Sequence, residues 1–190
     1  GKVDRQGRFF VGTMDDSEEK ASGAFSRLDK TLLCRRVDDG FTVANGPAFS
    51  PDGRYMYAND SALQLTYAYT VTPDGTPAGK REFVRWGSDD GYPDGMTVDA
   101  EGCLWIAFWD GWCLRRYSPD GEWVETIKLP VQRPTSCTFG ALATPTTSAP
   151  RCLASCTAWM PTPPPAPVTS TVSPGPTPSS CTASQAVPKA

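Results

Sequence analysis

Near the middle of the chain, apolar and polar positions alternate on both sides of a short polar turn at residues 99–102. The alternating apolar positions are Met96, Val98, Leu104 and Ile106. This two-residue period predicts two strands joined by a tight turn. Asp94 stands just before the first strand in Pro-Asp-Gly, a composition typical of turns because proline fixes φ and glycine admits positive φ. We expect Asp94 at the entrance of a strand, as either a solvated turn residue or a functional acid.

The second half of this pattern occurs three times along the chain. Each copy has an apolar residue, a polar turn with a glycine, and an alternating, aromatic-rich strand that ends in a small residue. The copies cover residues 3–12, 49–58 and 98–107, and their glycines are Gly7, Gly53 and Gly102, 46 and 49 residues apart. A period in the forties with four short strands per unit is typical of β-propeller blades. The repeat therefore predicts an all-β fold, a β-propeller.

Two weaker repeats support the blade interpretation. Thr-Pro-Asp-Gly at residues 72–75 and Ser-Pro-Asp-Gly at residues 118–121 follow the second and third main copies, where the second hairpin of each blade is expected. Four aspartates recur with the blades, and we assign them to turns because a single catalytic site would not repeat. They are Asp4, Asp52, Asp99 and Asp120.

Aromatic residues are expected to supply the packing between twisted sheets. The tryptophans in question are Trp86, Trp105, Trp109, Trp112 and Trp123. Helix signals are weak. The acidic run at residues 15–20 has no apolar face, so it predicts a solvated loop.

Composition narrows the possible chemistry. The chain has 190 residues, a formal net charge of −3 and no histidine. The charge is too small and too mixed to predict nucleic acid or an anionic membrane surface as a partner. Without histidine, a His-ligated zinc site and Ser-His or Cys-His catalysis within this chain are excluded. Any bound metal must use oxygen ligands or thiolates.

Cysteine usage gives an expectation about the compartment. The seven cysteines are an odd number without metal-ligand spacing. Cys103 and Cys113 flank a Trp-rich strand pair, and we expect buried small hydrophobic residues there rather than a disulfide. This usage favours a reducing compartment, and we expect a cytoplasmic protein.

The amino end, residues 1–4, has no signal-peptide organisation and does not begin with Met. It opens directly on a repeat unit, so we expect the chain to start inside a domain. No apolar run approaches the ~20 residues that span a bilayer.

Residues 141–190 differ in composition from residues 1–140. They hold eleven of the nineteen prolines, two charged side chains (Arg151 and Lys189) and one aromatic residue (Trp159). Such a segment cannot bury enough apolar surface to offset chain entropy, so we predict a disordered Pro/Ala/Thr/Ser-rich tail after the folded domain at residues 1–140. The functional alternatives are a Pro-rich ligand for SH3-like domains and a mucin-like stalk. A frame-shifted segment is a further interpretation, which translation of the coding DNA in the other two frames would test.

Several motifs within residues 1–140 are specific in their order and spacing. They are Gly-Lys-Val-Asp at 1–4, Gly-Arg-Phe-Phe-Val-Gly-Thr-Met at 7–14, Asn-Gly at 45–46, Phe-Ser-Pro-Asp-Gly-Arg at 49–54, Tyr-Ala-Asn-Asp-Ser at 57–61, Pro-Asp-Gly-Met-Thr-Val-Asp-Ala-Glu-Gly at 93–102, Leu-Pro at 129–130, Arg-Pro-Thr-Ser at 133–136 and Phe-Gly at 139–140. Together they resemble the SMP-30/gluconolactonase/LRE family, which includes regucalcin and the sugar lactonases.

This resemblance implies a six-bladed β-propeller with one divalent cation in its central channel, bound by a Glu, an Asn and an Asp. Asn45 matches the Asn-Gly motif and Asp94 the Pro-Asp-Gly-Met motif, so both resemble metal ligands. Such oxygen donors suit Ca²⁺, with Zn²⁺, Mg²⁺ and Mn²⁺ as alternatives. The implied reaction is hydrolysis of a sugar lactone to the aldonic acid, with the cation as Lewis acid and Asp94 also as catalytic acid/base. Asn-Gly is also the commonest tight-turn dipeptide, so a turn role for Asn45 stays open.

The chain departs from this family in extent. At about 47 residues per blade, residues 1–140 supply roughly three blades of six. The family's Glu ligand and its sugar-contacting Arg and Asn would precede Gly1, so no substrate-binding residue is assigned. The acidic run at residues 15–19 falls where some relatives carry a substrate-contacting acid. Two hypotheses follow: a metal-dependent sugar lactonase seen as a partial chain, or a truncated, non-catalytic propeller fragment that acts at most as a binding module.

Overall fold

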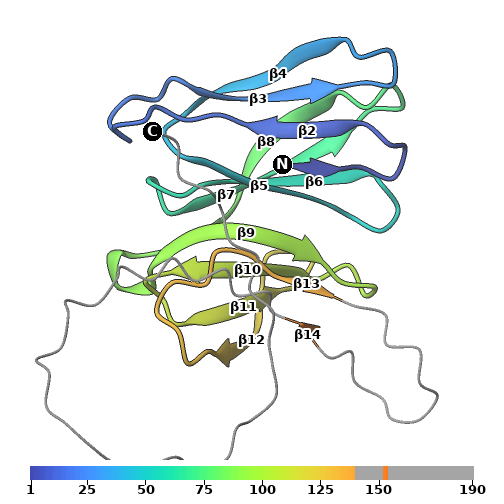
Figure 1. The fold of residues 1–190 in the computed structure, drawn as a ribbon. Coiled ribbons are helices and arrows are strands. Elements are labelled where there is room, and N and C mark those ends of the chain that lie inside the picture. Colours follow the sequence, from blue (N-terminus) through green and yellow to red (C-terminus); the bar gives the residue numbers. More distant parts are fainter. Residues whose placement is uncertain (140–151, 154–190) are drawn as a thin grey trace, which may run out of the picture. The chain divides into compact units, whose positions relative to one another are not determined.

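The computed structural model describes residues 1–139 and 152–153, and three antiparallel sheets of four strands follow one another along it (Figure 1). The first sheet contains β1 (Lys2–Val3), β2 (Phe9–Gly12), β3 (Gly23–Leu28) and β4 (Cys34–Phe41). The second contains β5 (Ala44–Phe49), β6 (Tyr55–Asp60), β7 (Leu65–Val71) and β8 (Pro77–Arg85). The third contains β9 (Tyr92–Val98), β10 (Leu104–Trp109), β11 (Cys113–Tyr117) and β12 (Trp123–Lys128). Strand order in each sheet follows the chain, as in a propeller blade, so the predicted all-β propeller with three blades is confirmed.

The remaining elements are short. A 3₁₀ turn, η1 (Ser88–Asp90), joins the second and third sheets, and β13 (Thr138–Phe139) pairs with β14 (Cys152–Leu153). The acidic run forms a loop, as predicted. Within residues 1–139 and 152–153, no helix is long and apolar enough to cross a bilayer. The predictions of disorder and of a frame shift for residues 141–190 fall outside the described residues, apart from β14.

The repeated turns join the first two strands of each sheet. Their glycines are Gly7, Gly53 and Gly102, with φ values of 81°, 71° and 86°. This left-handed backbone costs glycine little because it has no Cβ. In the third sheet, the Asp99 carboxylate accepts hydrogen bonds from the backbone N–H groups of Glu101 (3.0 Å) and Cys103 (2.9 Å). Asp4 and Asp52 accept backbone N–H groups in the same way, which confirms their assignment to turns.

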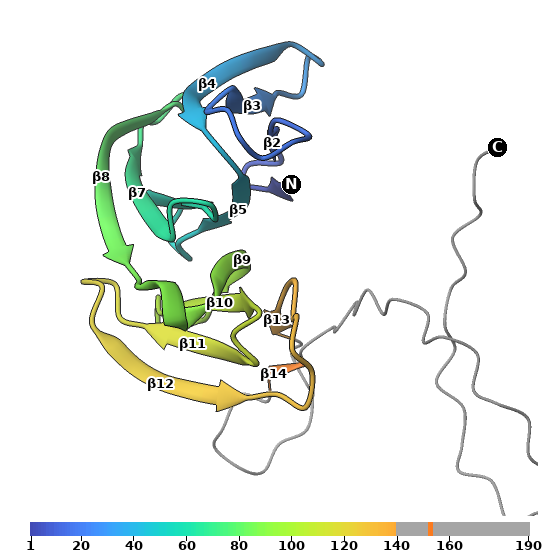
Figure 2. The same ribbon diagram turned by 90° about the vertical axis from the view of Figure 1, so that its left-hand side faces the viewer.

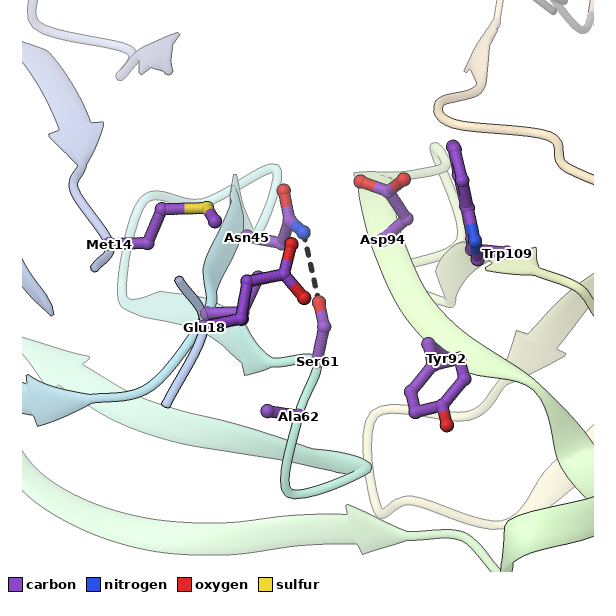
Figure 3. A pocket seen from close by; sticks show the side chains of 9 residues that line it. Met14, Glu18, Asn45, Ser61, Ala62, Tyr92, Asp94 and Trp109 are labelled. Atoms are coloured by element: carbon purple, nitrogen blue, oxygen red, sulfur yellow. Dashed lines mark hydrogen bonds between the residues drawn. The ribbon is translucent and has the colours of Figure 1, made fainter. Parts of the chain in front are cut away.

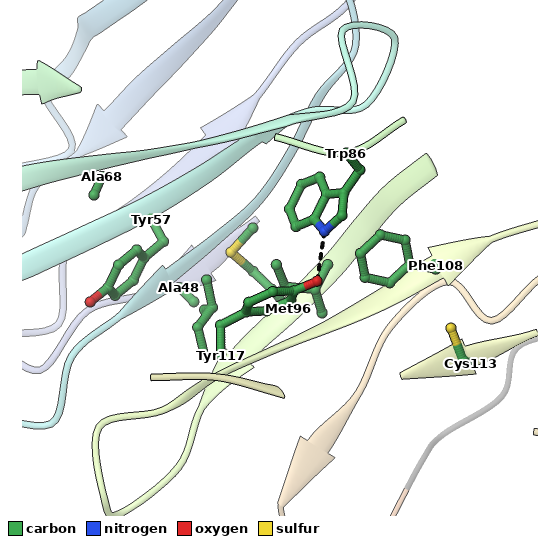
Figure 4. Packing of buried hydrophobic residues seen from close by; sticks show 10 residues of the cluster. Ala48, Tyr57, Ala68, Trp86, Met96, Phe108, Cys113 and Tyr117 are labelled. Carbon is green, nitrogen blue, oxygen red and sulfur yellow. Dashed lines mark hydrogen bonds between the residues drawn. The ribbon is translucent and has the colours of Figure 1, made fainter. Parts of the chain in front are cut away.

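Apolar side chains of neighbouring sheets pack in two clusters. The first and second sheets contribute Phe10, Phe25, Phe41, Met56, Ala58 and Tyr69. The second and third contribute Ala48, Tyr57, Ala68, Trp86, Met96, Leu104, Ile106, Phe108, Cys113 and Tyr117 (Figure 4). Trp86 meets Phe108 edge to face, with ring centroids 5.1 Å apart, and its Nε1 donates a 2.6 Å hydrogen bond to Tyr117 Oη. Buried aromatic rings with a satisfied polar atom hold these sheets together.

The cysteines in this core behave as predicted. Cys103 and Cys113 are both buried, and neither forms a disulfide. They therefore act as small apolar residues in the third sheet.

The first strands of the second and third sheets, β5 and β9, lie next to each other (Figure 2). A side-chain atom added at Gly46 on β5 would lie only 3.3 Å from the Met96 side chain on β9. The absence of a side chain at Gly46 thus permits this close approach. Residues of two blades consequently meet along these strands.

Candidate functional site

Asn45 and Asp94 occupy equivalent places in neighbouring sheets. Each lies on the first strand of its sheet, where pairing with the second strand shifts register: after Asn45 on β5, and around Asp94 on β9. Such β-bulges turn side chains out of the regular alternation. The prediction of a turn at Pro-Asp-Gly is wrong, because Asp94 lies inside β9. The backbone there forms a β-bulge and does not reverse direction.

Both residues line one cavity of about 570 Å³, which Figure 3 shows from close by. The other lining residues are Met14, Glu18, Val43, Ser61, Ala62, Tyr92 and Trp109. The loop after β2, the start of the second sheet and the inner edge of the third sheet therefore share one cavity. The structure brings together the two residues that the sequence singled out.

The amide of Asn45 is oriented by a neighbouring hydroxyl. Its Nδ2 donates a 2.9 Å hydrogen bond to Ser61 Oγ (Figure 3). The Ser61 hydroxyl in turn donates to the backbone carbonyl of Pro93, on β9. This chain of bonds turns the Asn45 carbonyl oxygen away from Ser61 and leaves it available in the cavity as a donor to a cation.

Asp94 is a half-buried acid beside this amide. Burial raises the pKa of its carboxyl to about 6, because the charged form loses solvation, while the backbone N–H of Gly95 lowers the pKa in part. In residues 1–139, no Lys or Arg forms an ion pair with the Asp94 carboxylate. Without a cationic partner, the ionised form of a half-buried carboxylate is destabilised, and a cation bound nearby would stabilise it.

The backbone around Asp94 is held from two directions. Asn59, fully buried on β6, donates a 2.6 Å hydrogen bond from Nδ2 to the carbonyl oxygen of Asp94. The backbone N–H of Gly95 donates a 2.8 Å hydrogen bond to the carbonyl oxygen of Thr135. A Cβ at Gly95 would lie 2.6 Å from that same oxygen, so only glycine fits here. The segment after β12 and the second sheet thus fix the position of Asp94.

Glu18 is a site residue that sequence reasoning left unassigned. It comes from the acidic loop, with φ of 58°, and its side chain extends towards Asn45 and Ser61 in Figure 3. No local signal separates it from the other acids of the run. Tyr92 and Trp109 were also missed, because aromatic residues were assigned to packing between sheets.

The residues of this cavity fit a hard cation. An amide oxygen and carboxylate oxygens are the donors that Ca²⁺ and Mg²⁺ prefer. Among the residues that the structure describes, no group of three or more His, Cys, Asp or Glu side chains is close enough to hold a metal ion. Asn45 and Asp94 line the same cavity and carry oxygen atoms of this kind.

The fold and the site define a β-propeller protein with an oxygen-donor site at the first strands of its blades. A model of the SMP-30/gluconolactonase/LRE-like region matches residues 1–146. The chain belongs to this family.

Two relatives and one solved structure illustrate the similarity. The chain is 37% identical over 143 residues to the 6-deoxy-6-sulfogluconolactonase of Pseudomonas putida, covering 74% of this chain and 48% of the relative. It is 38% identical over 141 residues to the L-arabinolactonase of Azospirillum brasilense, covering 73% and 47%. A calcium-binding protein, regucalcin, from Agrobacterium tumefaciens superposes with a TM-score of 0.69 at 25% identity, covering 73% and 47%. The chain thus spans about half the length of the relatives it matches.

Proposed function

We propose that the protein hydrolyses a sugar lactone to the aldonic acid with a bound divalent cation, and that Asn45 and Asp94 are two of the ligands. The observation that carries this proposal is the half-buried Asp94 carboxylate without an ion-pair partner in residues 1–139, beside an oriented Asn45 carbonyl in one cavity. Two relatives are sugar lactonases and the similar solved structure is a calcium-binding protein, which supports a lactone as substrate and Ca²⁺ as the ion. Zn²⁺, Mg²⁺ and Mn²⁺ are the alternatives.

When bound, the cation supplies Lewis-acid polarisation of the lactone carbonyl. Asp94 accepts a proton from the attacking water as the water oxygen bonds to the carbonyl carbon. Asp94 then returns this proton to the ring oxygen as the ester C–O bond breaks. In the cation-free chain the pKa of this carboxyl is about 6, so Asp94 is ionised at neutral pH, the form that accepts the proton.

Glu18 has a different role in this proposal. Its exposed carboxylate accepts hydrogen bonds from hydroxyl groups of the sugar at the side of the cavity opposite Asp94. A carboxylate can accept several such bonds, so this contact favours a polyhydroxylated substrate over a plain aliphatic lactone.

A cytoplasmic location is also part of the proposal. Cys34, Cys103 and Cys113 carry free thiols. Free thiols are the usual state in reducing compartments.

Acid release from a panel of aldonolactones tests the proposed function. We expect chelation to abolish hydrolysis, Ca²⁺ to restore it, and Asp94→Asn to lower kcat by about 100-fold or more. Asp120→Asn is the matched control, because Asp120 is exposed in the turn after β11. A rate that survives both chelation and Asp94→Asn would refute the proposal.

Calorimetric titration with Ca²⁺ gives a readout that does not depend on turnover. Binding should be tighter than millimolar and should weaken in both Asn45→Ala and Asp94→Asn. Binding that is unaffected by both substitutions would place the ion elsewhere and remove these residues from the ligand set.

A further inference from the structure

Trp109 lines the same cavity as Asp94 but has no part in the proposed chemistry. It is the last residue of β10 and pairs with Tyr92 across the ladder, so two aromatic side chains lie beside the bulge that carries Asp94. Packing of the core does not require it there, because the buried clusters are formed without it. A large aromatic ring at the wall of the cavity that holds Asn45 and Asp94 therefore calls for a separate account.

One face of the Trp109 indole is covered by a cation. The guanidinium of Arg133 lies 4.9 Å from the ring centroid. Arg133 is not among the residues that line the cavity. Figure 3 shows the indole nearly edge-on beside the Asp94 carboxylate, so one face of the ring is turned towards Asp94.

The cation is itself held in place. Arg133 Nε donates a 2.7 Å hydrogen bond to Asp110 Oδ1, and Gln132 Nε2 donates a 2.9 Å hydrogen bond to the same oxygen. The carbonyl of Thr135, two residues further along, accepts the hydrogen bond from Gly95. One short segment after β12 thus fixes both the indole and the backbone beside Asp94.

We propose that Trp109 is the platform on which the ring of the substrate lies, and that Arg133 and Asp110 are positioning residues that hold the indole in this orientation. The C–H groups on one face of a sugar ring carry a small positive charge and are attracted to the negative face of an aromatic ring. A ring that lies on Trp109 has its carbonyl carbon beside Asp94 and its hydroxyl groups within the cavity. This inference rests on the proposed function and adds that the substrate is a cyclic polyol lactone with an apolar C–H face.

Kinetics separate a platform from a catalytic group. Trp109→Leu should raise KM about tenfold with kcat within about threefold, whereas Trp109→Phe, which keeps a smaller ring, should raise KM about threefold. Arg133→Met should raise KM, and Arg133→Lys should restore most of the loss, because Lys can also place a cation on the indole. Trp123→Phe is the matched control, since Trp123 is 65% exposed on β12.

Binding of an aldonolactam, in which a ring nitrogen replaces the ring oxygen, tests the platform without turnover. Saturation-transfer NMR should show the strongest transfer to the ring C–H protons in the native chain and a loss of this pattern in Trp109→Leu. If the lactam binds in this way but no lactone is hydrolysed, the platform stands and the proposed function fails. If hydrolysis depends on Asp94 but Trp109→Leu binds the lactam as the native chain does, the proposed role of Trp109 is refuted. The same follows if the native chain binds no lactam.

Discussion

The carboxamide of Asn59 donates a 2.6 Å hydrogen bond to the backbone carbonyl of Asp94, from the second strand of one sheet to the first strand of the next. Asn59 is fully buried, and its own Oδ1 accepts a hydrogen bond from Thr66. The position of the candidate acid on β9 is therefore set by a polar side chain of the neighbouring blade. A substitution of Asn59 should therefore lower the stability of the fold and also disturb the position of Asp94.

Asn59→Ala should lower the free energy of unfolding by about 2–3 kcal/mol, because it leaves the Asp94 carbonyl and the Thr66 hydroxyl buried without their partner. Thr66→Val removes only one of these groups and keeps the shape, so it should lower stability by about 1 kcal/mol. Urea unfolding measures both values, and hydrolysis of the lactone panel should fall in the alanine variant alone. Equal stability of Asn59→Ala and the native chain would show that the hydrogen bond from Asn59 to the Asp94 carbonyl does not stabilise the contact between the two blades.

Gly95→Ala should disturb the site through a steric clash. Its Cβ would come 2.6 Å from the carbonyl oxygen of Thr135, so the segment after β12 must move, at a cost of about 1–3 kcal/mol. Gly87→Ala is the matched control, since its Cβ would have only Asp90 Oδ2 nearby, at 3.8 Å, and its φ of −93° suits any residue. Thermal unfolding and Ca²⁺ titration check this. A Gly95→Ala variant that matches the control in both would refute the close approach.

Much of the fold could be predicted because the turns and strands of each blade depend on residues that are close together in the sequence. Gly7, Gly53 and Gly102 mark turns that need positive φ, and such turns depend on only a few neighbouring residues. Alternation in the flanking residues then gives the strands. These signals recur at the period of a blade, so the three sheets could be counted from the sequence.

The site was predictable only in part. Asn45 and Asp94 stood out through family motifs, but the bulge that holds Asp94 could not be read from Pro-Asp-Gly, because the same residues also form turns. Glu18 and Trp109 come from other parts of the chain, and only the packing of the sheets brings them to the cavity. Local pattern cannot show which acid of a run, or which of several tryptophans, faces a cavity.

Tyr117→Phe should destabilise the contact between the second and third sheets. The substitution leaves the buried Nε1–H of Trp86 without its 2.6 Å partner, which should cost about 1–3 kcal/mol (Figure 4). Tyr55→Phe is the control, because Tyr55 is 37% exposed on β6. Denaturant unfolding measures the difference. If both variants unfold at the same denaturant concentration, the Trp86–Tyr117 hydrogen bond contributes nothing to stability.

The stability of the metal-free chain should depend on pH through Asp94. Its carboxyl has a folded-state pKa of about 6, above the ordinary value of 3.8, because burial disfavours the charge. Because the folded-state pKa is raised, the protonated Asp94 carboxyl makes its full contribution to folding stability below about pH 4. This contribution is lost as the pH rises through about 6. Asp94→Asn stays neutral, so it should exceed the native chain in stability by up to about 3 kcal/mol at pH 8 and match it near pH 4.

Thermal unfolding in the presence of chelator, at pH 8 and at pH 4, measures this difference. Asp120→Asn should show no such dependence, because Asp120 is exposed to solvent. Added Ca²⁺ should reverse the order at pH 8, since the cation binds the ionised carboxylate of the native chain and stabilises it by mass action. An Asp94→Asn variant that is less stable than the native chain at pH 8 without metal would mean that the carboxylate is satisfied by the protein itself, and that the cavity has no need of a cation.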